Sequence, residues 1–135
     1  MLPGAEAQTL DPIRQLPGYW GWEMSDLPLE ERAGSCADGP LRIWFEEDGA
    51  RYNSQQVGEA VIATAPILVN LPSTETSAGF LIRYDGEDRL DDAGRPVAWI
   101  LIMESADMFY WVRSDWVSEG GRTRSLVRCD EALIG

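Results

Sequence analysis

The most apolar stretch of the chain, residues 96–116, predicts a β-hairpin. Residues 97–103 and 108–113 read as two strands joined by the polar turn 104–107. Successive side chains of a strand point to opposite faces. A tight turn would place Leu101 opposite Tyr110 and Met103 opposite Met108. One face would then carry Trp99, Leu101, Met103 and Tyr110, and the other Ile100, Ile102, Phe109 and Trp111.

Shorter runs of apolar or alternating apolar and polar residues predict further strands. They cover residues 19–24, 41–46, 51–55, 58–70, 79–84 and 123–129. Asp48-Gly49 between two of these runs is a hairpin signal. Pro66 cannot donate to a central ladder, so we expect it to divide or bend the run that contains it.

The number and spacing of these strands predict an all-β fold. Roughly eight or nine short strands with regular turn signals favour an antiparallel barrel, with a β-sandwich as the alternative. Residues 9–16, with Pro12 suited to a first helical turn, predict a short N-terminal helix. We expect residues 1–8 to be a flexible N-terminal segment and residues 9–135 to form a single β-barrel domain.

Charge limits the partners. The chain has 23 acidic and 11 basic residues, a net charge of −12. Such a surface repels phosphate backbones and anionic lipids, so we expect no nucleic-acid partner. No run of apolar residues is long enough for a transmembrane helix, and we expect no membrane insertion.

The absence of histidine limits the chemistry. The 135 residues contain no His, which removes the commonest general base and the usual catalytic triads. The acidic residues 85–92 do not follow a calcium-loop spacing, and we interpret them as a solvated turn. We therefore expect no catalytic residues, metal or cofactor, and the sequence leans away from an enzyme.

Cys36 and Cys129 are the two cysteines of the chain. An even count, with one cysteine in a loop and one at the end of the last strand, predicts a disulfide. Two free thiols in a cytosolic protein are the alternative. Ala5-Glu6-Ala7 is similar to the end of a secretory cleavage site. Together these features predict an exported protein, periplasmic or extracellular.

Gly18-Tyr19-Trp20, a G-x-W at the start of the first predicted strand, resembles the opening of lipocalin and calycin barrels. The resemblance implies that Trp20 packs at the closed end of a barrel. It also implies a basic residue from the last strand across the indole, here Arg124 or Arg128, in a cation–π contact.

Aromatic residues carry the functional prediction. Six Trp, four Tyr and three Phe suit either a packed core or an apolar cavity. We expect a non-enzymatic barrel that binds an apolar or aromatic small molecule through Trp20, Trp22, Trp99, Leu101, Met103 and Tyr110. The alternative is a structural or protein-binding β-domain with a solid core. Phe109 and Trp111, on the opposite hairpin face, would contact the N-terminal segment, a second copy or a partner protein.

Overall fold

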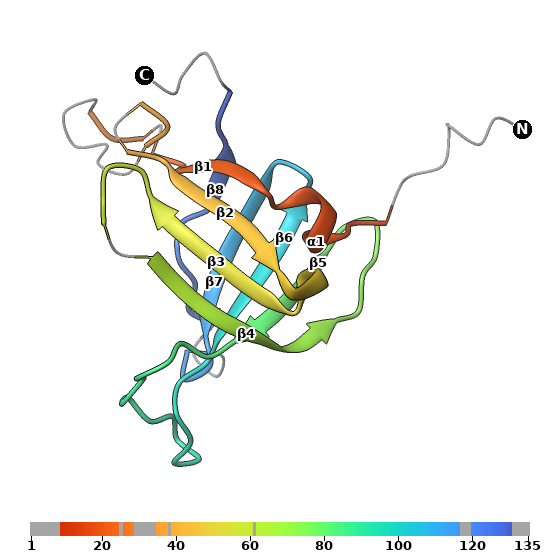
Figure 1. Ribbon diagram of the computed structural model, residues 1–135, viewed down its shortest axis with the longest axis vertical. Coiled ribbons are helices and arrows are strands. Elements are labelled where there is room, and N and C mark those ends of the chain that lie inside the picture. Colours follow the sequence, from red (N-terminus) through yellow and green to blue (C-terminus); the bar gives the residue numbers. More distant parts are fainter. Residues whose placement is uncertain are drawn as a thin grey trace, which may run out of the picture.

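The computed structural model describes residues 9–24, 26–28, 35–37, 39–60, 62–116 and 120–130. Within them, eight antiparallel strands follow one another around a closed barrel, and the last pairs with the first (Figure 1). The strands are β1 (Gly18–Trp22), β2 (Leu41–Glu46), β3 (Arg51–Gln56), β4 (Ile62–Leu71), β5 (Ala78–Ile82), β6 (Trp99–Ser105), β7 (Met108–Arg113) and β8 (Leu126–Arg128). The predicted all-β barrel is confirmed. The predicted flexible segment 1–8 lies outside the described residues.

One end of the barrel is closed by the short helix α1 (Pro12–Gln15), which confirms the predicted N-terminal helix (Figure 1). Leu16, directly after this helix, is fully buried and its carbonyl accepts the indole N–H of Trp20 at 2.8 Å. The guanidinium of Arg128 lies 4.5 Å from the centre of the Trp20 ring. Arg128 is therefore the basic residue across the indole, whereas Arg124 pairs with Asp26 at 2.7 Å.

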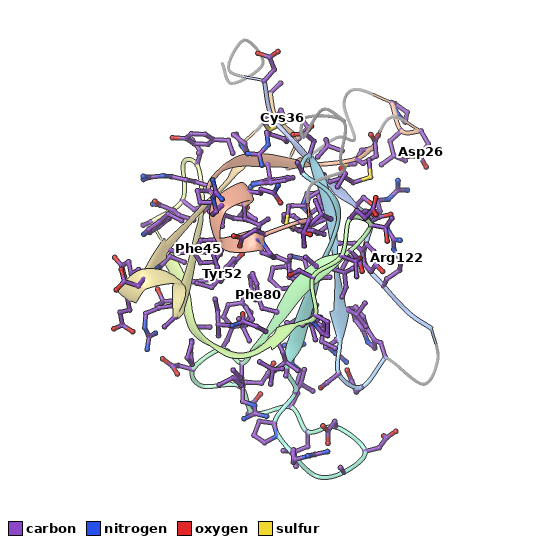
Figure 2. All side chains as sticks on the ribbon, turned by 90° about the vertical axis from the view of Figure 1, so that its right-hand side faces the viewer. Asp26, Cys36, Phe45, Tyr52, Phe80 and Arg122 are labelled. Carbon is purple, nitrogen blue, oxygen red and sulfur yellow. A yellow bond between two sulfur atoms is a disulfide. The ribbon has the colours of Figure 1, made fainter. Side chains whose placement is uncertain are left out.

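The middle of the barrel is filled with aromatic rings. Figure 2 shows Phe45, Tyr52 and Phe80 gathered inside, and Phe80 lies 5.9 Å from Phe45 and 5.7 Å from Tyr52. The series continues from Tyr52 to Trp111 at 5.8 Å and from Trp111 to Phe109 at 6.0 Å. Offset and edge-to-face contacts of this kind stabilise a core beyond the area they bury. Space for a ligand must therefore lie beyond this packed layer.

The β6–β7 hairpin forms as predicted, but the predicted pairing of its residues is wrong. A register shift between Met103 and Ser105 places Met103 opposite Phe109, and Leu101 opposite Trp111. The physical reason is a β-bulge, which adds one residue to one strand and exchanges the faces of the partner strand. Phe109 and Trp111 consequently point inwards.

This correction removes the predicted contact surface. The Phe109 side chain is fully buried and Trp111 is 8% exposed, so neither is available to a partner. Tyr110 lies on the outer wall instead, with the guanidinium of Arg122 3.7 Å from its ring centre. The outer face of the hairpin is therefore covered in part by a side chain of the same protein.

Pro66 does not divide its strand. It lies in β4 opposite Arg51, the first residue of β3, where the pairing of the two strands ends. A missing N–H is tolerated at such a position. The strand instead shifts register between Ile67 and Val69, after Pro66.

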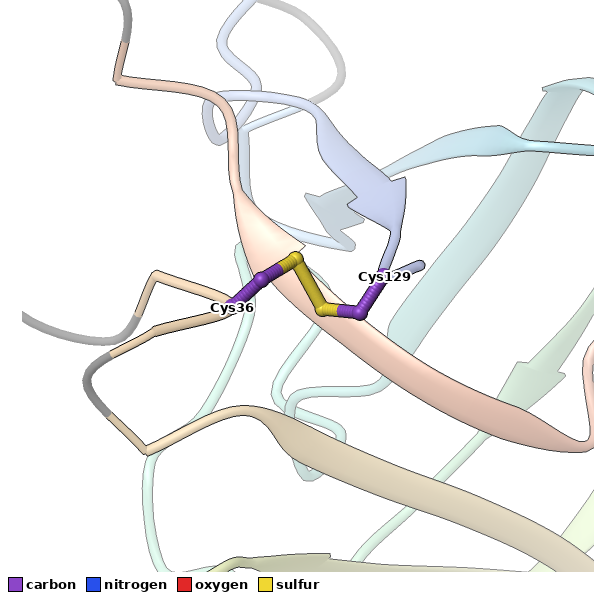
Figure 3. Close-up of a disulfide and its surroundings, with 2 residues drawn as sticks. All are labelled: Cys36 and Cys129. Atoms are coloured by element: carbon purple, nitrogen blue, oxygen red, sulfur yellow. A yellow bond between two sulfur atoms is a disulfide. The ribbon is translucent and has the colours of Figure 1, made fainter. Parts of the chain in front are cut away.

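A disulfide joins Cys36 to Cys129, with their Cα atoms 5.4 Å apart, and confirms the predicted bridge. Figure 3 shows the bridge beside β1. Gly21 permits this arrangement, because a Cβ on Gly21 would lie 2.5 Å from the backbone nitrogen of Cys36. The connection between β1 and β2 is thereby fastened to the residue that follows β8.

Candidate ligand-binding site

A pocket of about 350 Å³ lies at the end of the barrel opposite α1, where β1 ends and β6 begins. Its lining comes from β1, β6, β7 and the connections after β5 and β7, and consists of Trp22, Tyr84, Arg89, Trp99, Trp111 and Thr123. Pockets of this size accommodate small organic ligands. Three indoles and a phenol make the lining predominantly aromatic.

The aromatic walls are held by contacts with one another. Trp99 meets Trp111 edge to face at 6.2 Å and 87°, and meets Trp116 at 5.4 Å and 81°. Trp116 in turn lies under the guanidinium of Arg113, at 4.8 Å. Trp111 belongs both to this wall and to the packed middle layer. The pocket therefore rests on the core.

The two hydroxyl groups of the pocket lining, those of Tyr84 and Thr123, are already engaged. Tyr84 shares a hydrogen bond with Tyr52, which also interacts with Ser54, and burial raises the pKa of both phenols well above the ordinary range. The Thr123 hydroxyl accepts the backbone N–H of Trp111 at 3.0 Å and donates to the Arg124 carbonyl at 2.9 Å. These groups fix the wall and stay uncharged near neutral pH.

Two ion pairs lie at the open end. Arg89 donates to both oxygens of Glu87, at 2.9 and 2.6 Å, and Arg113 donates to both oxygens of Asp115, each at 2.6 Å. These hydrogen bonds hold the pKa of both carboxyl groups below the usual range. Each pair also influences the pKa values of the other, so the four charges form one local group.

The structure brings together only part of the predicted ligand set. Trp22 and Trp99 line the pocket. Leu101, Met103 and Trp20 are fully buried in the core and closed end. Tyr110 is on the outer wall under Arg122.

Four lining residues were outside the predicted set. Trp111 was assigned to the wrong face because the bulge in the hairpin has no signal in the alternating pattern. Arg89 stands in the acidic connection that reads as a solvated turn, and Tyr84 continues the inward-facing series of Phe80 and Ile82. That last alternation was a usable signal for Tyr84. Thr123 had none.

The described part of the chain contains neither a metal-ligand cluster nor a membrane-spanning helix. No cluster of three or more His, Cys, Asp or Glu residues in that part could hold a metal ion. Among the described helices, none has the length and apolar character needed to cross a bilayer.

Comparisons with known proteins add little. No protein-family model and no curated protein matches the sequence. Among solved structures, the crystal structure of pallilysin from Treponema pallidum is similar, with 12% identity, a TM-score of 0.46, and coverage of 95% of this chain and 87% of that chain. A likeness at this level carries no functional inference, so the assignment below rests on the pocket itself.

Proposed function

We propose that the protein is a non-enzymatic β-barrel that binds an apolar or aromatic small molecule at its open end. The observation that carries the proposal is the pocket of about 350 Å³ bounded by Trp22, Trp99 and Trp111. Aromatic walls with few polar groups are typical of small-molecule sites. The packed layer below confines the ligand to the mouth of the barrel.

The closed end supports a calycin-type barrel as part of this proposal. Trp20, on β1, the strand that follows α1, lies under Arg128, and this is the arrangement that the lipocalin and calycin resemblance implies. Export is proposed on the Cys36–Cys129 disulfide, because such bonds persist in oxidising compartments.

A second candidate is a protein-binding domain. The solid middle of the barrel favours it, together with the exposed apolar side chains Leu68 and Val69 on β4, which are 43% and 51% exposed. In that case the mouth would bind no small molecule. A partner, or a second copy in a homodimer, would instead cover the β4 surface.

Replacing Trp99 by alanine tests the small-molecule proposal. We expect N-phenyl-1-naphthylamine, a neutral fluorescent probe, to gain fluorescence on binding the wild-type protein. The Trp99→Ala variant should bind at least about tenfold more weakly, because it loses a wall that buries aromatic surface. The measurement is a fluorescence titration with circular dichroism to verify folding.

Trp44→Ala is the matched control. Trp44 lies on the outer face of β2 between the inward-facing Ile43 and Phe45, with Arg42 over its ring at 4.9 Å. The Trp44→Ala variant should bind the probe with the same affinity as the wild type. Absence of binding to the wild type, or an equal loss in both variants, would contradict a ligand site at the open end.

A further inference from the structure

Arg89 is the one charged residue among the six described residues that line the pocket. Its guanidinium carries five N–H groups in a planar fork. Two of them donate to Glu87, through Nε at 2.9 Å and Nη2 at 2.6 Å. No described residue accepts from the remaining three. The pocket thus has three cationic N–H donors without a described acceptor beside its aromatic lining.

Glu87 holds this guanidinium in place. Its side chain is 7% exposed, whereas that of Arg89 is 51% exposed. The Glu87 carboxylate also accepts the backbone N–H of Arg89 at 3.2 Å. Both oxygens are therefore used to orient a single residue, with the outer edge of the guanidinium left open.

The described lining of the pocket supplies hydrogen-bond donors and contains no carboxylate. Glu87 is engaged by Arg89, and Asp115 is engaged through both oxygens by Arg113. The Thr123 hydroxyl is used by the backbone. A ligand that complements this set must carry acceptors. A carboxylate is the group whose geometry matches the two-pronged edge of a guanidinium.

An organic cation is the competing ligand class, because aromatic walls attract cations through their rings. Arg89 already brings a positive charge to the lining. Of the three carboxylates whose charges act on Arg89, Glu87 and Asp115 are paired with arginines, and the third, Asp88, does not line the pocket. The net charge of −12 does favour a cation at long range. Salt screens that field with a Debye length of about 8 Å at physiological ionic strength. The charge of the ligand that the pocket favours is therefore set by the nearby guanidinium of Arg89.

We propose that the ligand is an aromatic or apolar carboxylic acid, with its carboxylate bound by Arg89 and its body against Trp22, Trp99 and Trp111. This inference rests on the proposed function and names the chemical class that the same pocket selects. Glu87 is the positioning residue for the guanidinium.

Three probes with one aromatic body test this class. They are 2-naphthoate, the neutral 2-naphthamide and the cationic 2-naphthylmethylammonium, titrated by isothermal calorimetry near neutral pH. We expect 2-naphthoate to bind about tenfold or more tightly than the amide, as charge-assisted hydrogen bonds allow. The ammonium compound should bind most weakly.

The Arg89→Gln variant should remove the preference. We expect about a tenfold loss of affinity for 2-naphthoate with little change for 2-naphthamide. Arg95→Gln is the control because it removes the same charge. Arg95 is an exposed arginine of the same connection and does not line the pocket. The Arg95→Gln variant should bind 2-naphthoate as the wild type does.

The outcomes separate the two proposals. Equal binding of the three probes, tightest binding of the ammonium compound, or an equal loss in the Arg89→Gln and Arg95→Gln variants would overturn the acid-binding inference. The proposed small-molecule function would survive each of those results. Binding of none of the three probes, nor of N-phenyl-1-naphthylamine, would overturn both.

Discussion

Trp20→Ala is expected to lower the free energy of unfolding by about 3–5 kcal/mol, the range for truncating a large buried aromatic side chain. Trp20 is fully buried, lies 4.7 Å from Phe109 and holds the guanidinium of Arg128 against its ring at 4.5 Å. Its removal also leaves the Leu16 carbonyl without its donor. Urea denaturation followed by far-ultraviolet circular dichroism measures the change.

Trp20→Phe gives the graded comparison. This variant keeps much of the apolar volume but not the N–H donor. Its free energy of unfolding should therefore fall clearly less than that of Trp20→Ala. If Trp20→Ala costs less than about 1 kcal/mol, as most tolerated substitutions do, Trp20 does not close the barrel end as described.

Removal of the disulfide is the second large effect. Cys36 and Cys129 are separated by 93 positions, and the chain-entropy model gives about 4–5 kcal/mol for closing a loop of that length. The Cys36→Ser, Cys129→Ser double variant should therefore unfold at much lower urea concentration than the oxidised wild type. Adding reductant to the wild type should reproduce the loss, and it should leave the double variant unaffected.

Intact mass after alkylation without reductant checks the bridge independently. With the bridge formed, we expect no alkylated thiol in protein isolated from its native compartment. Two alkylated thiols, or a double variant as stable as the oxidised wild type, would contradict it.

The architecture was readable from the sequence because local pattern determines it. Period-two alternation identified β2 at its observed bounds, and the hairpin β6–β7 within two residues. Even cysteine count and strand position identified the bridge. The G-x-W resemblance placed Trp20 at the closed end and narrowed its cationic neighbour to two arginines, of which Arg128 makes the contact.

The candidate site was only partly readable from the sequence because its lining depends on strand register and on the placement of loops. A bulge between Met103 and Ser105 exchanges the faces of β7, and no property of these side chains distinguishes the two pairings. Arg89 lies in the connection between β5 and β6, and the course of that connection places it at the pocket. Its proposed role depends on the contact with Glu87, which no local sequence pattern reveals.

The indole N–H signals of the six tryptophans offer the most direct test of a ligand site at the open end. In a ¹H–¹⁵N titration with 2-naphthoate, the signals of Trp22, Trp99 and Trp111 should shift together. Their shifts should fit one shared dissociation constant. Those of Trp20, in the closed end, and Trp44, on the outer wall, should remain in place. Shifts confined to Trp20 or Trp44, or no shift at any tryptophan at saturating probe, would contradict the account.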